Sequence, residues 1–159
     1  MNDVDLEHLR RAVDLAEIAL EAGEEPYGSV LVGADGTVLM EDHNRTSGGD
    51  QTRHPEFELA RWAANHLAPA DRATATVYTS GEHCAMCSAA HAWVGLGRIV
   101  YAASTTQLVG WLTDWGIAPG PVRPLAVQEV APGVPVDGPA PELEAEVRVL
   151  HARLHGVAS

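Results

Sequence analysis

The sequence contains no lysine, and its basic charge comes from ten arginines. Against these stand 22 aspartates and glutamates, which gives a formal net charge of −12 at pH 7. Proteins that bind nucleic acid normally present a basic face that neutralises phosphates, and an anionic membrane surface repels an acidic chain. We therefore expect no nucleic-acid partner and no membrane association.

Long apolar runs and disulfide-forming cysteines are also scarce. No stretch reaches the roughly 18 uninterrupted apolar residues that a membrane span needs, and the acidic N-terminus does not resemble a secretory signal. The two cysteines, Cys84 and Cys87, make no disulfide framework, and reduced thiols are typical of the cytoplasm. We therefore expect a cytoplasmic protein.

The chain has 159 residues, of which 46% are apolar, enough for one domain with its own core. Hydrophobic periodicity predicts helices over 4–20, 55–67, 84–94, 105–115 and 139–154. Apolar and β-branched runs predict a hairpin over 28–40 and strands over 74–79, 98–102 and 122–130, and the proline-rich stretch 131–141 predicts a surface connection. Strands that alternate with helices after an opening hairpin favour an α/β fold with a mixed sheet.

Two local patterns carry chemistry. His54-Pro-Glu56 stands at the start of one predicted helix, and Cys84-Ala-Met-Cys87 stands at the start of the next. One imidazole and two thiolates are three protein ligands, the number that leaves a tetrahedral zinc ion one position for water. Cysteines three residues apart share a helix face, and the positive end of the helix dipole favours thiolates. We therefore predict that His54, Cys84 and Cys87 bind Zn²⁺.

Glu56 has a different predicted task, because two residues beyond His54 it cannot easily point toward the metal in the same direction. A carboxylate beside a metal site can take a proton from water, protonate a ring nitrogen and later protonate a departing amine. We predict that Glu56 is the catalytic proton shuttle.

Structural interpretations stand beside these predictions. The cysteines could form a redox pair, a structural zinc site or part of the core, although a redox pair needs no upstream His-x-Glu and a structural zinc normally has a fourth protein ligand. His91 offers such a ligand, but about 10 Å along a regular helix separates it from Cys84. His54 could instead be a helix-cap histidine, and Glu56 a first-turn acid that suits the helix dipole.

With these motifs the chain resembles the cytidine deaminase superfamily, whose zinc nucleobase deaminases carry H-x-E followed by P-C-x-x-C. The stretch 25–32 (Glu-Pro-Tyr-Gly-Ser-Val-Leu-Val) is similar to the first strand of that family, and 76–80 to the strand before its cysteines. Within the superfamily the chain looks most like the guanine deaminase and tRNA adenosine deaminase branch. The resemblance implies a three-layer α/β/α sandwich with a mixed sheet of about five strands, one zinc deaminase domain over 1–159 and a homodimer.

Two positions depart from the family pattern. Pro55 replaces a small residue between the histidine and the glutamate, and proline suits the first position of a helix. His83 replaces the proline that usually precedes the first cysteine, which places an imidazole near the metal. We expect His83 to line the substrate mouth, with a satisfied surface histidine as the alternative.

The resemblance also implies substrate contacts. Asn44 stands where family members carry a substrate-contacting asparagine, with a turn residue as the alternative, and Trp93 is expected to wall the base pocket unless it belongs to the core. Asp114 corresponds to an aspartate of similar guanine deaminases, where its carboxylate could accept N–H groups from a guanine-like ring edge. Residues 140–155 are a candidate C-terminal helix or lid. The remaining candidates are expected to have structural or surface roles: Glu82 as a cap, and His8, His66, His151 and His155 at the surface.

The combined prediction is a zinc-dependent hydrolase that deaminates a free guanine-, cytosine- or aminotriazine-like base and releases ammonia. A tRNA adenosine, nucleoside or nucleotide deaminase is the alternative within the superfamily, although the stretch 142–146 is acidic and the sequence shows no convincing phosphate-gripping site. A non-catalytic, zinc-stabilised interaction module is the alternative from another class.

Overall fold

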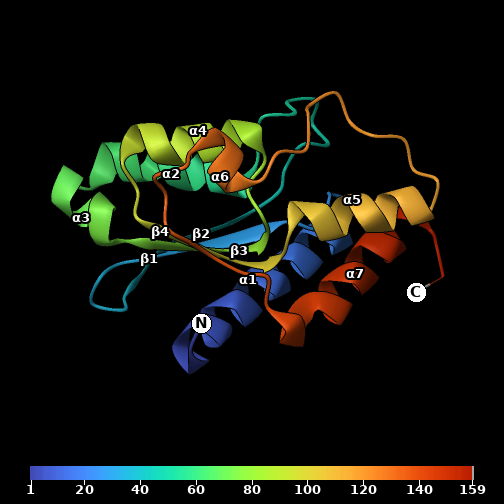
Figure 1. Cartoon of the computed structure of the whole chain (residues 1–159), viewed down its shortest axis with the longest axis horizontal. Helices are drawn as coiled ribbons and strands as arrows, with labels where there is room; N and C mark the ends of the chain where they lie inside the picture. The colour runs from blue at the N-terminus through green and yellow to red at the C-terminus, as the bar shows by residue number, and fades with distance from the viewer. Residues whose placement is uncertain (159) are drawn as a thin grey trace.

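A computed structural model describes residues 1–158 and arranges them as a five-stranded sheet between layers of helices (Figure 1). The elements in chain order are α1 (Asp3–Glu21), β1 (Gly28–Val32), β2 (Val38–His43), α2 (Pro55–His66), α3 (Pro69–Thr74), β3 (Thr76–Gly81), α4 (Ala85–Val94), β4 (Arg98–Ala103), α5 (Thr105–Asp114), α6 (Val127–Val130), β5 (Val136–Asp137) and α7 (Pro141–His155). The predicted α/β fold with a mixed sheet is confirmed.

The strand order is β2-β1-β3-β4-β5. β1 is antiparallel to both β2 and β3, whereas β3, β4 and β5 run parallel to one another. The register places Ser29 opposite Thr79 and Gly81 opposite Ala103. The carboxyl ends of β3 and β4 therefore meet at one edge of the sheet, where open α/β sheets usually hold their ligands.

Alternate residues along each strand face opposite helix layers, as the pleat of a strand requires. Val30 in β1 and Val100 in β4 belong to a core cluster with α1 and α7. Leu31 and Val77 belong to a second cluster with α2. Figure 1 shows the same division, with α1 and α7 on one side of the sheet and α2, α4 and α6 on the other.

Gly28 allows α1 to pack directly on the first residue of β1. A Cβ atom at this position would lie 2.4 Å from the Ala12 carbonyl oxygen and 2.5 Å from the Leu15 Cβ. Only glycine fits so close an approach without movement of the helix backbone. The glycine thus sets the position of Ser29, the next residue of the strand.

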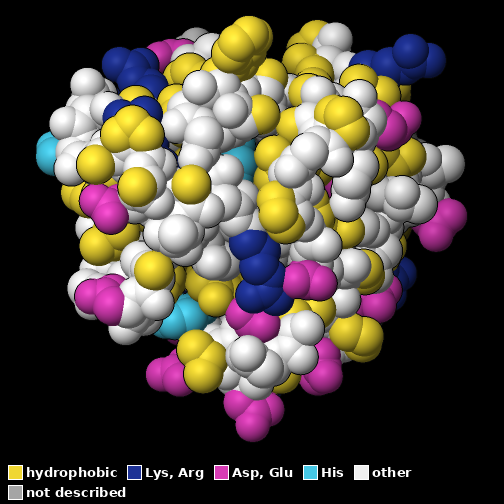
Figure 2. Space-filling view, turned by 60° about the vertical axis from the view of Figure 1, so that its left-hand side comes forward, with side chains coloured by type: hydrophobic (Ala, Val, Ile, Leu, Met, Phe, Trp, Pro, Cys, Tyr) yellow, Lys and Arg dark blue, Asp and Glu magenta, His cyan; other side chains and the backbone are white. Residues whose placement is uncertain are grey.

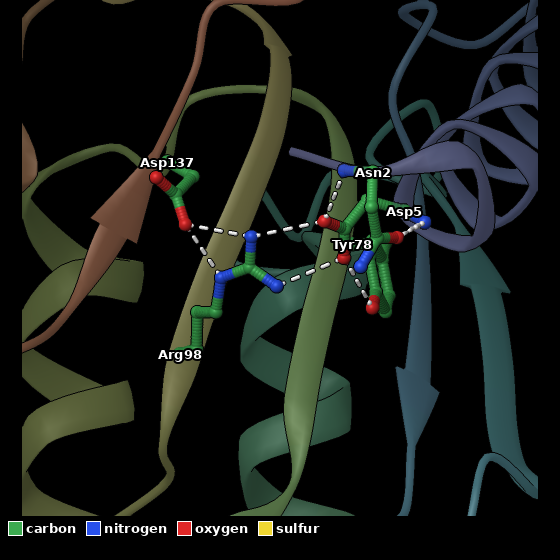
Figure 3. A network of polar contacts seen from close by, with 5 residues as sticks. All are labelled: Asn2, Asp5, Tyr78, Arg98 and Asp137. Atoms are coloured by element: carbon green, nitrogen blue, oxygen red, sulfur yellow. Dashed lines mark hydrogen bonds and ion pairs between the residues drawn. The ribbon is translucent and has the colours of Figure 1, made fainter.

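A polar network joins α1 to the amino-terminal ends of β3 and β4 (Figure 3). Asp5 accepts hydrogen bonds from the Tyr78 hydroxyl at 2.9 Å and from Arg98 Nη1 at 2.8 Å. Arg98 Nε also donates to Asp137 at 2.6 Å. Because Arg98 opens β4 and Ala103 ends it, this network lies at the opposite end of β4 from the edge where the carboxyl ends of β3 and β4 meet.

The strand predicted over 122–130 is wrong. Residues Val127–Val130 form α6, and Val127 is fully buried against Ile99 and Tyr101 of β4. The strand beside β4 is β5, two residues long, inside the stretch predicted as a surface connection. A strand this short has no period that sequence analysis can detect, and Pro124 has no N–H to donate to a sheet.

Other boundaries differ by small amounts. Pro69 opens the unpredicted helix α3, so β3 begins at Thr76 and not at 74. The C-terminal segment forms α7 as a helix that packs on α1 and β4 of the same chain, with Leu143, Val147 and Leu150 in the core. None of the helices within residues 1–158 is long and apolar enough to cross a membrane.

Candidate active site

His54 is placed by the proline that follows it. Pro55 occupies the first position of α2 and restricts the preceding residue to extended backbone, so His54 (φ −80°, ψ 140°) lies just outside the helix. Its imidazole is therefore displaced from the helix face on which the apolar residues of α2 pack.

Cys84 and Cys87 belong to the first turn of α4, directly after the carboxyl end of β3. Cys84 is the N-cap residue, and Cys87 is fully buried one turn further on. Both sulfurs lie 3.6 Å from His54 Nδ1, and the three ligand atoms all lie within 4.8 Å of one another. Two ligand atoms that share a tetrahedral zinc at the usual bond lengths are about 3.5 Å apart.

The donor set therefore fits a zinc ion. Three donors, two of them sulfur, are the ligand types and number of a zinc site that keeps one position open. Within residues 1–158 no fourth His, Cys, Asp or Glu joins this group. His91, the alternative fourth ligand, instead lies with Nε2 2.8 Å from the Gly97 carbonyl oxygen.

The two thiols differ in their electrostatics. Hydrogen bonds from the Cys87 thiol and from His54 outweigh burial and lower the pKa of Cys84 to about 4. The same contact with Cys84, together with burial, raises the pKa of Cys87. Hydrogen bonding to Cys84 also raises the pKa of His54. A thiolate is thus already favoured at one of the two positions, and a divalent cation would favour it at both.

Glu56 lies beside this group, with one carboxylate oxygen held by the sheet and the other facing the metal ligands. Its Oε1 accepts hydrogen bonds from Ser29 Oγ and Thr79 Oγ1, each at 2.9 Å, while its Oε2 lies 3.8 Å from Cys87 Sγ. Burial raises the pKa of Glu56, the direction that makes a carboxylate a better proton acceptor.

A cavity of about 540 Å³ opens over these residues. His54, Glu56 and Cys84 form part of its lining at the carboxyl end of β3. Most of the remaining lining is apolar and comes from α5 and from the loop 117–125, with Trp111 as the one α5 residue that is almost fully buried. The cavity therefore joins a polar metal-binding end to an apolar chamber, the usual composition of a small-molecule site.

Several predicted substrate contacts do not line this cavity. Trp93 is 90% exposed near the end of α4, away from the pocket that it was expected to wall. Asp114 is exposed at the end of α5, because at 100° per residue it lies about 200° around the helix from the cavity-lining Leu112. The family resemblance that suggested both residues does not reveal which side of a helix faces a pocket.

Asn44 and His83 are buried but lie outside the lining. Asn44 Oδ1 accepts hydrogen bonds from the backbone and hydroxyl of Thr46, and its Nδ2 has no partner within the described chain. His83 is 1% exposed and stands edge-on to His91 with ring centroids 5.4 Å apart. His83 thus lies neither at the surface nor at the mouth of the cavity, so both expectations for it were wrong. The substrate contact of Asn44 stays a prediction.

Four other residues of the site were not found in the sequence. Ser29 and Thr79 hold Glu56, and Tyr27 and His151 line the cavity. His151 was expected at the surface, yet it is only 3% exposed. The one feature of the sequence that could have predicted its burial is its position next to Leu150, which belongs to the apolar face of α7. Glu82 was expected to cap the helix that follows it, but it accepts hydrogen bonds from the backbone N–H groups of Thr105 and Val127, the first residues of α5 and α6.

Comparison with known families identifies this arrangement. The model of the cytidine and deoxycytidylate deaminase zinc-binding region matches residues 2–103, which include all three predicted metal ligands and Glu56. The chain belongs to this family. Its members bind zinc, and the His54, Cys84 and Cys87 group of this deaminase-family chain fits that metal.

Individual relatives carry different names. A probable cytosine deaminase of Schizosaccharomyces pombe is 32% identical over 109 residues, 69% of this chain and 66% of the relative. A guanine deaminase of Bacillus subtilis is 37% identical over 101 residues, 62% of this chain and 64% of the relative. The matched part thus spans just under two thirds of the length of each of these two relatives. The solved guanine deaminase of Nitrosomonas europaea superposes over 94% of this chain and 83% of its own, with a TM-score of 0.69 and 19% identity, and so shares the fold.

Proposed function

We propose that this family member is a zinc-dependent hydrolytic deaminase of a free amino-heterocycle, a guanine-, cytosine- or aminotriazine-like base. The observation that carries the proposal is the placement of the Glu56 carboxylate, which two hydroxyls hold beside the three predicted zinc ligands at the polar end of a mainly apolar cavity. The names of the cytosine and guanine deaminase relatives support the substrate class.

Each residue has a defined task in this reaction. His54, Cys84 and Cys87 would hold the zinc ion, which would supply the Lewis acidity that makes water a nucleophile near neutral pH. Glu56 accepts a proton from the attacking water, delivers it to the ring nitrogen, and then delivers the second proton to the amine. The oxygen of water bonds to the amine-bearing carbon, the C–N bond breaks and ammonia leaves, without any change of oxidation state.

Charge favours a small neutral substrate over tRNA. The chain carries a net charge of −12, and the outer face of α7 contributes Glu142, Glu144 and Glu146. On the face shown in Figure 2, basic side chains stand at separate places and form no continuous patch. A labelled anticodon stem-loop at physiological salt should therefore bind no more tightly than an unrelated RNA hairpin, whereas specific binding would favour a tRNA deaminase.

Ammonia release from a panel of substrates tests the proposal. Zinc-loaded protein is incubated with free bases, their nucleosides and aminotriazines, beside a matched Glu56→Gln variant. Turnover of at least one free base, lost in Glu56→Gln at full zinc content, is the expected result. Zinc binding without ammonia from any substrate would instead identify a non-catalytic zinc module.

The protein also assembles as a homodimer in this proposal. The support is Trp93, a large aromatic side chain that is 90% exposed on α4, since aromatic residues are enriched where protein surfaces associate. Light scattering should give twice the chain mass for the wild type and a shift toward monomer for Trp93→Arg. A monomeric wild type would contradict the dimer.

The two metal-binding thiols suit a reducing compartment, which agrees with a cytoplasmic location.

A further inference from the structure

His151 is a buried titratable side chain that the proposed reaction does not use. It comes from α7, is 3% exposed and lines the same cavity as Glu56. Its ring stands edge-on to Tyr27 with centroids 5.3 Å apart, and lies 6.3 Å from the ring of Trp111 at 45°. Three aromatic side chains from distant parts of the chain therefore form one wall of the cavity.

The nitrogens of His151 have no hydrogen-bond partner in the part of the chain that the structure describes. Within residues 1–158 no hydrogen bond engages either of them. They also differ from the nitrogens of His83, which are unpartnered but sealed from any solvent or cavity. The His151 nitrogens are therefore accessible from the cavity, where water or a polar group of a bound ligand can serve as their hydrogen-bond partner.

The imidazole is neutral in this environment. Burial lowers the pKa of His151 to about 4, and the nearby His155 acts in the same direction. A neutral imidazole presents one N–H donor and one acceptor. Such a group complements a ring edge that carries its own donor and acceptor, whereas phosphate oxygens are normally bound by cations or by N–H donors alone.

We propose that His151 determines substrate specificity by hydrogen-bonding the polar edge of a neutral nitrogen heterocycle, while Tyr27 and Trp111 contact the ring. The inference rests on the proposed function for the class of ligand, an amino-heterocycle in this cavity. It adds a contact from α7, a helix outside the stretch 2–103 that the family model matches.

A packing role is the competing explanation, and two substitutions separate it from recognition. His151→Phe keeps a planar ring of similar size and removes both nitrogens. His151→Gln removes the ring and keeps a donor and an acceptor at similar reach. His155→Phe is the matched control, since His155 lies one turn further along α7 and does not line the cavity.

Recognition by the nitrogens predicts a loss in His151→Phe that His151→Gln partly restores. We expect kcat/KM for the best free base of the panel to fall about tenfold or more in His151→Phe, mainly through KM, at unchanged zinc content and Tm. His151→Gln should keep a larger fraction of kcat/KM, and His155→Phe should match the wild type. Wild-type kcat/KM in His151→Phe for every base would overturn the inference.

A binding measurement separates failure of this inference from failure of the proposed function. Uracil and xanthine, the products of cytosine and guanine deamination, are added to the zinc-loaded protein while the histidine ring resonances are recorded by NMR. The His151 resonance is assigned by its loss in His151→Gln. A shift with either probe supports recognition even if no base is turned over, whereas turnover without a shift and without an effect of His151→Phe rejects recognition and leaves the deaminase.

Discussion

Thr79 Oγ1 donates a hydrogen bond to Glu56 Oε1 at 2.9 Å and so connects the central strand β3 to the first turn of α2. Ser29 Oγ reaches the same oxygen from β1, because the register sets Ser29 opposite Thr79. One carboxylate oxygen is thereby anchored to the sheet, and the other is left on the side of the metal ligands. Ser29 and Thr79 thereby position Glu56, the proposed proton shuttle.

The first prediction concerns this anchor. Thr79→Val removes the hydroxyl at nearly equal volume, so the Glu56 carboxylate loses one of its two anchors. We expect kcat to fall by about tenfold at full zinc content, because small misplacements of a catalytic group slow the chemical step. Thr76→Val at the other end of β3 is the control, and a Thr79→Val enzyme with unchanged kcat would contradict the positioning role.

Metal removal should weaken the fold as well as the activity. The ligands come from the starts of α2 and α4, so a shared zinc ion ties two helices together and its binding energy adds to folding. We expect Cys87→Ser, or chelation of the wild type, to lower zinc content and to reduce Tm by several degrees. Met86→Leu, between the two cysteines, should retain the metal. Zinc content is measured by mass spectrometry and Tm by calorimetry.

Two glycine substitutions should act in opposite directions. Gly28→Ala brings a Cβ to 2.4 Å from the Ala12 carbonyl oxygen, and we expect a loss of about 2 kcal/mol in the free energy of unfolding. Gly110→Ala in the exposed part of α5 meets nothing within 4 Å and should add about 0.5–1 kcal/mol, since alanine is the better helix former. Urea denaturation of both variants measures the two changes in the free energy of unfolding. Equal changes in the two variants would contradict the close packing of α1 on β1.

The Asp5 network predicts a pH-dependent part of stability. Burial acts to raise the pKa of Asp5, but hydrogen bonds from Arg98, the Asn2 N–H and Tyr78 outweigh it and hold the pKa below the ordinary 3.8. The folded state therefore favours the ionised form, and this stabilisation is present above about pH 4 and is lost as the pH falls further.

Asp5→Asn isolates that contribution. We expect it to cost about 1–3 kcal/mol at pH 7 and to flatten the acid side of the stability profile. Activity at neutral pH and zinc content should not change, because the network lies at the far end of β4 from the metal ligands. Denaturation curves between pH 3 and pH 7 make the measurement, and a variant profile parallel to the wild type would contradict the assignment.

The sequence predicted the features that depend on short spacings. The hairpin β1–β2 was found from its Asp35-Gly36 turn, and the helix starts at Pro55 and Cys84 were found within a residue. Local geometry sets these features: a proline admits few conformations before it, and residues three apart on a helix share a face. The predicted grouping of His54, Cys84 and Cys87 needed only that two helix starts meet at one sheet edge.

Features that depend on how distant surfaces pack were missed. The two-residue strand β5 exists because the backbone of β4 offers hydrogen bonds to it. Val127 packs against β4 as part of the helix α6, although the sequence predicted a strand there. Asp114 does not line the cavity, although Trp111, Leu112 and Thr113 immediately before it do.

The sequence by itself therefore determined the family, the fold class and the zinc-binding group with Glu56, since each is encoded in residue types at short intervals. Only the tertiary structure decided what surrounds that group. Ser29 and Thr79 reach Glu56 through strand register, and His151 reaches the cavity through the packing of α7 on α1 and β4. Those contacts join residues far apart in the chain, and their geometry arises from the burial of whole helix faces that no local pattern specifies.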